Sequence, residues 1–402
     1  MLSEQQAGFQ KGQSVKTAVL KVTDDLYGTL DKNGISLLLL LDFSKAFDTV
    51  SHHLLCKKLV TQFSFSTKAV SLVGSYLTKR TQCVSCAGKF SRSAELYSGI
   101  PQGSVLGPLL FCCYINDLPN VLKYCSIQLY ADDVQLYTLQ TGVPAAEIVR
   151  MVNEDLTRIS SWSRKNGLLI NSSKSVALWM RKRRNYRLDL TALPPVMMDD
   201  QPIEYSTSAI NLGFLFHTDL SWDGMINQQC GKIYAALRTL RCNTTSASTT
   251  IKLKLFKALI LPHFLFGDAV HVKPSATAMQ RLHVAVNRCV RYVYGLSRYS
   301  SATHLQRNLL GCPLNVLYNH RSCIFLHNLI TSQAPAPLYR KLNFLRGQRR
   351  QNLVVPVNTT SGYANSLFVH GVTNWNSLPT SLKRFTSKAF FKIGSLDFWN
   401  RQ

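Results

Sequence analysis

The sequence contains no hydrophobic run long enough to cross a membrane. Its longest aliphatic stretch covers residues 37–41, with Ile35 before it, far fewer than the roughly 20 apolar residues that a membrane-spanning helix needs. Residues 1–6 are mostly polar and include no apolar leader, so we expect an intracellular protein that is not secreted. The 11 cysteines are scattered along the chain, which fits reduced thiols in such a setting.

Motifs of several common enzyme classes are also missing. The chain has no glycine-rich phosphate loop, no nucleophile-elbow serine and no zinc-protease helix, so hydrolase functions lose support. Cys83 and Cys86 form one CxxC pair, but no second Cys or His pair follows at zinc-finger spacing. Two thiols on a strand therefore explain this pair better than a zinc site does.

Acidic residues are nearly absent from the second half of the chain. Residues 224–402 contain 23 Lys and Arg but only Asp268 and Asp397, a net charge of +21 out of +25 for the whole chain. The first 223 residues carry 23 basic and 19 acidic side chains. A solvated surface normally mixes both signs, so the acid-poor half predicts continuous contact with an anionic polymer such as nucleic acid, or with an anionic surface.

The hydrophobic pattern predicts an α+β protein. With 402 residues and 46% hydrophobic side chains, we expect two or three compact units rather than a disordered chain. Helical spacing of apolar residues occurs over residues 14–31, 53–60, 69–77, 106–114, 148–162, 226–240, 251–259 and 279–293. A buried strand is predicted over 35–41, a tight hairpin over 127–137 and a further strand over 168–180.

Three carboxylates lie at the ends of these predicted strands. Asp42 follows the buried strand, and Asp132 and Asp133 stand at the tip of the hairpin. Brought together without a cation, they would repel one another. Two divalent ions about 4 Å apart, held by such carboxylates, catalyse in-line phosphoryl transfer, and oxygen ligands favour Mg²⁺ or Mn²⁺. An isolated Asp-Asp pair is more often a simple turn, so the neighbouring motifs decide the interpretation.

Three motifs surround these carboxylates, namely LLDFSKAFDTV at residues 40–50, GIPQGSVLGPLLF at 99–111 and YADD at 130–133. They resemble the palm motifs of reverse transcriptases, most closely those of non-LTR (LINE-type) retrotransposons. Supporting strings are QAGF at 6–9, INDLP at 115–119, NGLLINSSK at 166–174 with Trp162 before it, and LG at 212–213 with Trp222 beyond it. Three separately rare strings in family order make the resemblance specific over about residues 6–225, and NWNSLP at 374–379 adds weaker support.

The resemblance implies the architecture of a right-hand polymerase. We expect a palm over residues 1–190, built from an antiparallel sheet with flanking helices and carrying residual fingers. The prolines at 194, 195 and 202 predict a linker over 191–204, followed by a mainly helical, thumb-like region over 205–300 and a basic C-terminal region over 301–402.

The resemblance also implies roles for single residues. Asp42, Asp132 and Asp133 would be catalytic and hold two Mg²⁺ (or Mn²⁺) ions, with the Phe43 carbonyl as a further metal ligand. Lys174 would protonate the pyrophosphate leaving group, although an exposed turn lysine explains it nearly as well.

Three further residues would bind the incoming nucleotide. Phe47 would lie under the sugar and exclude a 2′-hydroxyl, with a core aromatic as the alternative. Gln102 and Gly103 would present an amide and bare backbone to nucleotide and template.

The basic half fits a clamp on nucleic acid. In the helix predicted over 279–293, Arg281, Arg288 and Arg291 lie on one face and apolar residues on another, so we expect these arginines to bind phosphates. The basic run Arg181 to Arg184 fits the same track, a nuclear import signal or a solvated loop.

The sequence also departs from the family. The fingers segment that normally precedes Gly8, the endonuclease domain and a terminal Cys/His knuckle are not found, and Gln10 stands where a basic residue is common. We therefore expect a truncated copy and keep two hypotheses. The first is an RNA-directed DNA polymerase acting on an RNA template, a DNA primer and deoxynucleoside triphosphates. The second is a catalytically inactive, nucleic-acid-binding remnant. An RNA polymerase acting on RNA is disfavoured by Phe47.

Overall fold

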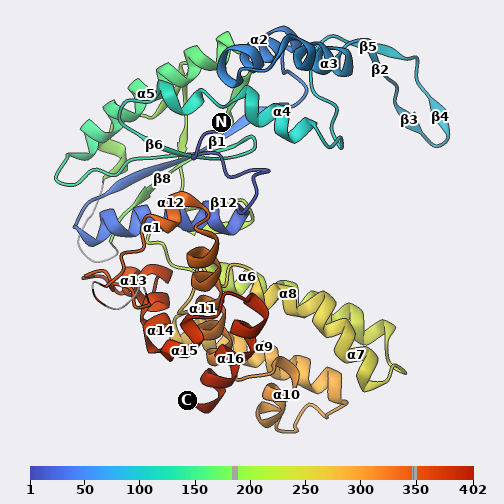
Figure 1. Ribbon diagram of the computed structural model, residues 1–402, viewed down its shortest axis with the longest axis vertical. Helices are drawn as coiled ribbons and strands as arrows, with labels where there is room; N and C mark the ends of the chain where they lie inside the picture. The colour runs from blue at the N-terminus through green and yellow to red at the C-terminus, as the bar shows by residue number, and fades with distance from the viewer. Residues whose placement is uncertain (183–188, 346, 348–350) are drawn as a thin grey trace. The chain divides into compact units, whose positions relative to one another are not determined.

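A computed structural model describes residues 1–182, 189–345, 347 and 351–402 (Figure 1). The chain forms two compact units, one of residues 1–18 and 33–207 and the other of residues 19–32 and 208–402. We call them unit 1 and unit 2. No helix among the described residues is long and apolar enough to span a membrane. All 11 cysteines lie in the described ranges and are free thiols.

Unit 1 combines helices with a five-stranded sheet. Its helices are α2 (His52–Phe63), α3 (Thr67–Leu77), α4 (Gly107–Tyr114), α5 (Ala145–Lys165), η1 (Leu118–Val121) and η2 (Leu190–Ala192). The sheet has the order β11-β8-β1-β7-β6, from β11 (Glu204–Tyr205), β8 (Leu169–Met180), β1 (Ser36–Ser44), β7 (Asp133–Tyr137) and β6 (Ser126–Tyr130). Two-stranded ribbons pair β2 (Arg80–Gln82) with β5 (Ala94–Leu96), β3 (Ser85–Cys86) with β4 (Lys89–Phe90), and β9 (Met197–Met198) with β10 (Gln201–Pro202).

The sheet is antiparallel except at one edge. β1 pairs antiparallel with both β7 and β8, and β6 with β7, whereas β11 runs parallel to β8. The expected mixture of helices with an antiparallel sheet is therefore confirmed, apart from this parallel edge strand.

One face of the sheet builds the core of unit 1. Side chains alternate along a strand, and Leu37, Leu39 and Leu41 of β1 join the core that helices α2, α4 and α5 cover (Figure 1). On β7, Val134 and Leu136 point the same way. The intervening residues of both strands, Asp42 and Asp133 among them, therefore lie on the opposite face.

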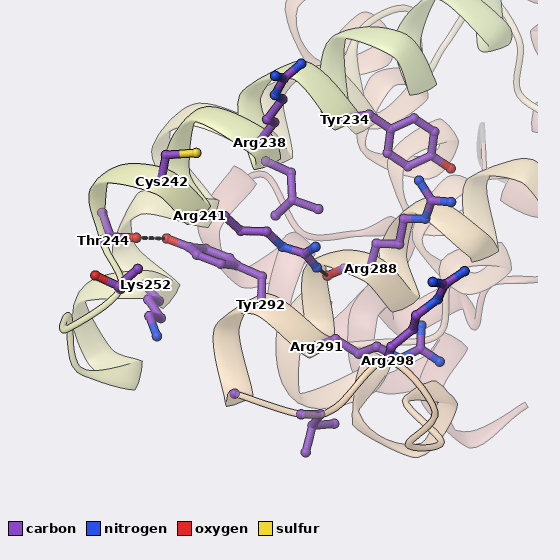
Figure 2. A pocket seen from close by; sticks show the side chains of 14 residues that line it. Tyr234, Arg238, Arg241, Cys242, Thr244, Lys252, Arg288, Arg291, Tyr292 and Arg298 are labelled. Carbon is purple, nitrogen blue, oxygen red and sulfur yellow. Dashed lines mark hydrogen bonds between the residues drawn. The ribbon is translucent and has the colours of Figure 1, made fainter.

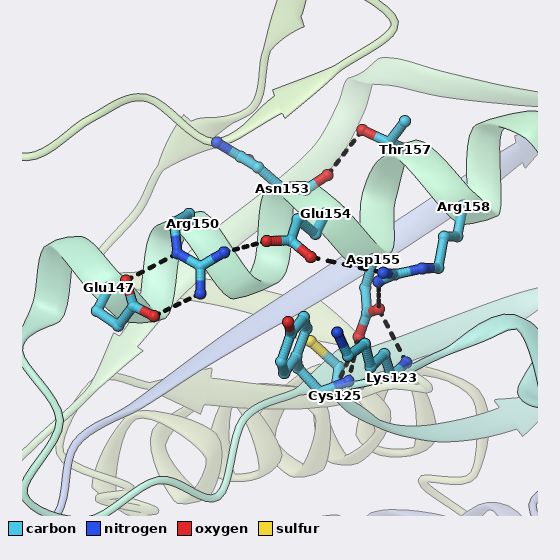
Figure 3. A network of polar contacts seen from close by, with 10 residues as sticks. Lys123, Cys125, Glu147, Arg150, Asn153, Glu154, Asp155, Thr157 and Arg158 are labelled. Atoms are coloured by element: carbon cyan, nitrogen blue, oxygen red, sulfur yellow. Dashed lines mark hydrogen bonds and ion pairs between the residues drawn. The ribbon is translucent and has the colours of Figure 1, made fainter.

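A buried carboxylate fixes the chain just before β6. Asp155 of α5 accepts hydrogen bonds from the backbone N–H groups of Lys123 (2.9 Å), Tyr124 (2.8 Å) and Cys125 (2.8 Å), and pairs with Arg158 (Figure 3). Burial alone would raise the pKa of Asp155, but these hydrogen bonds outweigh burial and lower it. β6, which leads to the Asp132-Asp133 tip, thus starts from an anchored position.

Unit 2 is mainly helical. Its helices are α6 (Asp223–Asn243), α7 (Thr249–Leu255), η3 (Phe256–Ile260), α8 (Leu261–Leu265), α9 (Ala276–Tyr294), η4 (Thr303–Leu305), α10 (Gln306–Leu310), α11 (Leu314–Ser332), α12 (Ala336–Tyr339), α13 (Ser361–Ala364), η5 (Leu367–Gly371), α14 (Val372–Ser377), α15 (Thr380–Lys383) and α16 (Lys388–Arg401). One hairpin joins β12 (Ser208–Asn211) to β13 (Phe214–His217). The core packs α6 against α9. The apolar spacing predicts both helices, over residues 226–240 and 279–293.

The first helix, α1 (Val15–Asp31), is divided between the units, and from Val19 onward it belongs to unit 2. Lys341 pairs there with Asp24 and, at 2.5 Å, with Asp25. Asp31 accepts hydrogen bonds from the backbone N–H groups of Thr359 (2.8 Å) and Thr360 (2.7 Å). The sequence analysis assigned this helix to the region 1–190. The spacing of apolar residues along the helix could not predict these ion pairs and hydrogen bonds, because they join residues some 320 positions apart.

The segment expected to be a linker, residues 191–204, is packed. Val196, Met198 and Ile203 are buried in the core of unit 1, and β9 pairs with β10 inside the segment. Pro194 and Pro195 precede this ribbon and Pro202 lies in β10, while the apolar residues between them supply the packing that an exposed linker would lack.

Candidate active site

The structure brings the three predicted catalytic carboxylates to one end of the sheet. β1 and β7 are paired up to Leu41 and Val134, and the same register carried one residue further would set Asp42 opposite Asp133. β6 and β7 close their hairpin at the pair Tyr130 and Asp133, which leaves Asp132 in the two-residue tip. All three side chains are half-buried.

The electrostatics of the site follow from this proximity. Burial raises the pKa of Asp133 to about 6, and the negative charges of Asp132 and Asp42 add to the increase. The pKa of Asp132 is also raised, first by burial and then by Asp42. Within the described residues, no Lys or Arg forms an ion pair with any of the three. An uncompensated cluster of this kind favours a bound cation.

The donor chemistry of this cluster fits a divalent metal ion. Carboxylate oxygens are the ligands that Mg²⁺ and Mn²⁺ prefer. However, no three carboxylate, imidazole or thiol groups in the described parts of the chain already stand in an arrangement that could hold a metal. Three like charges that lie close together without a cation repel one another. Binding would therefore require the side chains to converge.

The hairpin tip is held from outside by an N-terminal segment. Gln6 forms a parallel bridge with Leu129, and the Ala7 N–H donates to the Leu129 carbonyl at 2.8 Å. The fully buried Gln6 side chain accepts hydrogen bonds from the backbone N–H groups of Ala131 (3.0 Å) and Gly8 (2.7 Å). The residue next to Asp132 is thereby fixed by a side chain 125 positions away.

This clamp supports a strained turn. Ala131 has a φ of +54°, a left-handed conformation that costs a residue with a side chain about 1 kcal/mol or more. Gly8 lies so close that an added Cβ would stand 2.4 Å from the Ala131 nitrogen. Sequence reasoning noted QAGF at 6–9 but assigned Gln6 and Gly8 no role; the only signal was their presence in the family string.

The glycine-rich loop after β5 folds onto the turn after β1. The Gln102 side-chain N–H donates to Asp48 Oδ1 at 2.9 Å, and an added Cβ on Gly99 would lie 2.8 Å from the Asp48 carbonyl oxygen. The Ile100 N–H donates to the Phe47 carbonyl at 2.8 Å. The structure thus joins the second predicted motif to the first, and Asp48 is the residue that orients Gln102.

Gly103 and Phe47 occupy different surroundings. Gly103 is exposed with a φ of +79° and has open space where a Cβ would stand, so its backbone rather than its packing requires glycine. Phe47 is half-buried and stacks on Phe111, with ring centroids 4.4 Å apart. Its ring is therefore both a partner of the core and accessible from outside.

Lys174 and Phe43 lie near the same strand end. Opposite Leu40 and Asp42, the partner residue on β8 jumps from Val176 to Asn171, so the intervening residues bulge out. Lys174 lies exposed in this bulge, and its backbone N–H donates to Asn171 Oδ1 at 3.2 Å. The ring of Phe43 is buried in the core, and its carbonyl as a metal ligand stays a prediction.

The three predicted phosphate-binding arginines of α9 separate into two environments of unit 2. Arg288 and Arg291 line a basic hollow (Figure 2). Arg281 lies outside it and donates to Asn227 Oδ1 at 2.5 Å. The hollow is also lined by Arg238, Arg241, Lys252 and Arg298. The sequence did not indicate these four residues one by one, but the scarcity of acidic residues after residue 224 predicted a basic surface in this region. Of the basic run at 181–184, residues 183 and 184 lie outside the described residues; Lys182 bonds Asn33.

The model of one known protein family matches the part of the chain that contains these aspartates. The model of the family described as "Reverse transcriptase (RNA-dependent DNA polymerase)" matches residues 1–206, which is half of the chain. The chain belongs to the reverse transcriptase family. The resemblance that the palm motifs predict is therefore confirmed.

Relatives of this chain include proteins of insect mobile elements. It is 27% identical over 330 residues to a probable RNA-directed DNA polymerase from transposon X-element of Drosophila melanogaster, covering 79% of this chain and 35% of that protein. It is 26% identical to the one from transposon BS of the same species, covering 77% and 34%. The chain thus spans about a third of the length of these relatives.

Solved structures include a telomerase that aligns over most of the chain. Apo telomerase from Candida tropicalis is 11% identical and has a TM-score of 0.40, covering 84% of this chain and 57% of that one. A likeness at this level carries no further argument.

Proposed function

We propose that this chain is an RNA-directed DNA polymerase that adds deoxynucleotides to a DNA primer on an RNA template. The observation that carries the proposal is the gathering of Asp42, Asp132 and Asp133 at one end of the sheet in a reverse transcriptase family member, with raised pKa values for Asp132 and Asp133 and no basic partner among the described residues. In this proposal the sheet of unit 1 is the palm with residual fingers, and unit 2 contains the thumb.

Two divalent ions would be held by the three aspartates and the Phe43 carbonyl. When bound, such ions stabilise the charge that develops on the attacking and leaving oxygens of a phosphoryl transfer. The role of the protein is to keep these oxygens together, and the Gln6 clamp on the hairpin tip supports that role. Lys174, exposed on the bulge beside Asp42, would donate a proton to the departing pyrophosphate.

The loop after β5 and the turn after β1 would form the nucleotide site. Phe47 would lie against the sugar, and its stacking on Phe111 supports a ring held firmly enough to reject a 2′-hydroxyl. Gln102, oriented by Asp48, and the uncovered backbone at Gly103 would contact nucleotide and template. Arg281, Arg288 and Arg291 would bind nucleic-acid phosphates.

A second candidate is an inactive, nucleic-acid-binding remnant. It is favoured by one observation, namely that no three metal-binding side chains of the described residues are already arranged around a metal position. Salt-dependent nucleic-acid binding does not separate the candidates, because both predict it.

Primer extension separates them. We expect the purified chain to extend oligo(dT) on poly(rA) with dTTP and Mg²⁺, and the double variant Asp132→Asn, Asp133→Asn to extend nothing while it still binds the duplex. Binding without extension by the unmodified chain would favour the remnant. Extension by both proteins would contradict the assignment of the aspartates.

A further inference from the structure

A concave basic site lies within unit 2, apart from the aspartates of unit 1. Its volume is about 990 Å³, and helices α6, α7 and α9 and the loop after α9 contribute to its lining. The cationic residues of the lining are Arg238, Arg241, Lys252, Arg288, Arg291 and Arg298. No Asp or Glu takes part in the lining. We call this site the arginine pocket.

Carbonyl groups and aromatic rings, rather than carboxylates, hold these side chains. Arg291 donates to the Ser300 carbonyl through Nε (3.1 Å) and a terminal nitrogen (2.9 Å), and Arg241 donates to the Arg288 carbonyl at 3.4 Å. The Arg288 guanidinium lies 4.5 Å from the centre of the Tyr234 ring. Such partners orient a guanidinium but leave its full charge in place.

The remaining cations have even fewer internal partners. Arg238 and Arg298 are exposed and form no hydrogen bond or ion pair with the part of the chain that the structure describes. By contrast, Arg321 of the same unit pairs with the buried Asp268 at 2.5 Å, so carboxylate pairing is used elsewhere in unit 2. Six like charges around one hollow repel one another, and an anion with several closely spaced charges would relieve this.

The shape of the site indicates the kind of anion. Phosphates of a straight duplex run along a line and are met by a stripe of cations, whereas here arginines from two helices and a loop line one hollow (Figure 2). A strand that turns sharply presents several phosphates to one point. Tyr234 and Leu296, which are half-buried in the lining, add apolar surface for unstacked bases.

We propose that the arginine pocket binds the sugar-phosphate backbone of a single-stranded nucleic acid at a sharp turn, such as a hairpin loop. This site does not need the polymerase reaction. It would hold a folded segment of a bound nucleic acid while the aspartates act elsewhere on the chain.

The test compares a loop with a straight duplex on the full chain. Fluorescently labelled RNA stem–loop and a linear RNA–DNA duplex with the same number of phosphates are titrated with protein, and anisotropy is followed over a range of salt concentrations. The variant is Arg238→Ala, Arg298→Ala, whose side chains have no internal partner to lose among the described residues. The matched control is Arg307→Ala, Arg384→Ala, two exposed arginines of unit 2 outside the pocket.

We expect the unmodified chain to prefer the stem–loop and the double variant to lose that preference. Its loop affinity should fall about tenfold, and the slope of log affinity against log salt should shrink by about 1.4, for two lost contacts to single-stranded phosphates. Equal weakening on loop and duplex would overturn the proposal, because the pocket would then be part of a duplex track. An unchanged loop affinity, or the same loss in the control Arg307→Ala, Arg384→Ala, would also overturn it. A chain that binds the loop but extends no primer would contradict the proposed polymerase function alone.

Discussion

The side chain of Gln6 is hydrogen-bonded to the backbone of Ala131, the residue that precedes Asp132 at the hairpin tip. Its oxygen accepts the Ala131 N–H at 3.0 Å and the Gly8 N–H at 2.7 Å, and its side chain is fully buried. A residue near the start of the chain thereby controls the position of a carboxylate whose catalytic role is proposed above.

Gln6→Leu tests this control. The change leaves two buried N–H groups without an acceptor, which costs about 1–3 kcal/mol for each group. We expect a lower free energy of unfolding in urea and a fall of primer extension in kcat rather than in the KM for dTTP, because the affected element carries Asp132. Gln6→Glu keeps an acceptor but buries a carboxyl group, so it should recover stability only at a pH low enough to protonate that group. A higher KM for dTTP with an unchanged kcat, or normal extension by Gln6→Leu, would show that the clamp does not position the tip.

The raised pKa of Asp133 predicts a pH-dependent stability of the metal-free protein. The pKa is about 6 when folded and about 3.9 in an unfolded chain, so the folded state holds the proton more tightly. The contribution of Asp133 to the free energy of unfolding is therefore complete below about pH 4 and is lost as the pH rises through about 6.

The variant Asp133→Asn cannot ionise, so its stability relative to the unmodified chain should increase between pH 4 and pH 7. Thermal unfolding in metal-free buffer measures this difference. Mg²⁺ added at pH 7 should raise the midpoint of the unmodified chain more than that of the variant. A stability difference independent of pH would mean that Asp133 does not carry the raised pKa.

Phe47 predicts the choice of sugar. In Phe47→Val the ring that stacks on Phe111 is removed, and space opens for a 2′-hydroxyl. We expect the preference for dTTP over UTP to fall at least tenfold, measured as the ratio of kcat/KM values. Phe111→Leu serves as a control, since it disturbs the same stack but keeps the ring of Phe47. An unchanged preference in Phe47→Val would favour the alternative, a purely structural aromatic.

Replacing Asp155 should strongly lower the stability of the protein, although Asp155 has no proposed role in the reaction. Asp155→Ala leaves three backbone N–H groups without their acceptor and removes one of the two carboxylates paired with Arg158, so the free energy of unfolding should fall by about 2–5 kcal/mol in urea denaturation. Thr157→Ala on the same helix, whose exposed hydroxyl donates only to the Asn153 carbonyl, should change it by less than about 0.5 kcal/mol. Similar values for the two variants would contradict the anchoring role.

Sequence reasoning predicted the elements around the site because their signals are local. The unbroken apolar run before Asp42 predicts a strand buried on both faces, and the alternation around Asp132 predicts the hairpin. Both appear, as β1 and as the β6–β7 pair.

Other features depend on contacts between distant segments and escaped prediction. The Gln6 clamp, the bulge that carries Lys174 and the pairing of Lys341 with α1 each depend on residues far apart in the chain. The arginine pocket was visible only as a shortage of acids, because spacing along one helix does not tell which arginines of α6 and α9 share a hollow. The comparison with a family supplied the chemistry that no periodicity contains.

The dependence of primer extension on Mg²⁺ in single aspartate variants tests the central claim most directly. Rates are measured on poly(rA)/oligo(dT) over a Mg²⁺ series for the unmodified chain, Asp42→Asn, Asp132→Asn and the control Asp48→Asn. The account predicts saturable extension by the unmodified chain and a loss of about 100-fold or more in Asp42→Asn and Asp132→Asn, equivalent to several kcal/mol of transition-state stabilisation. Asp48→Asn should retain Mg²⁺-dependent extension, since its carboxylate orients Gln102 instead. Undiminished extension by Asp42→Asn or Asp132→Asn would contradict the account.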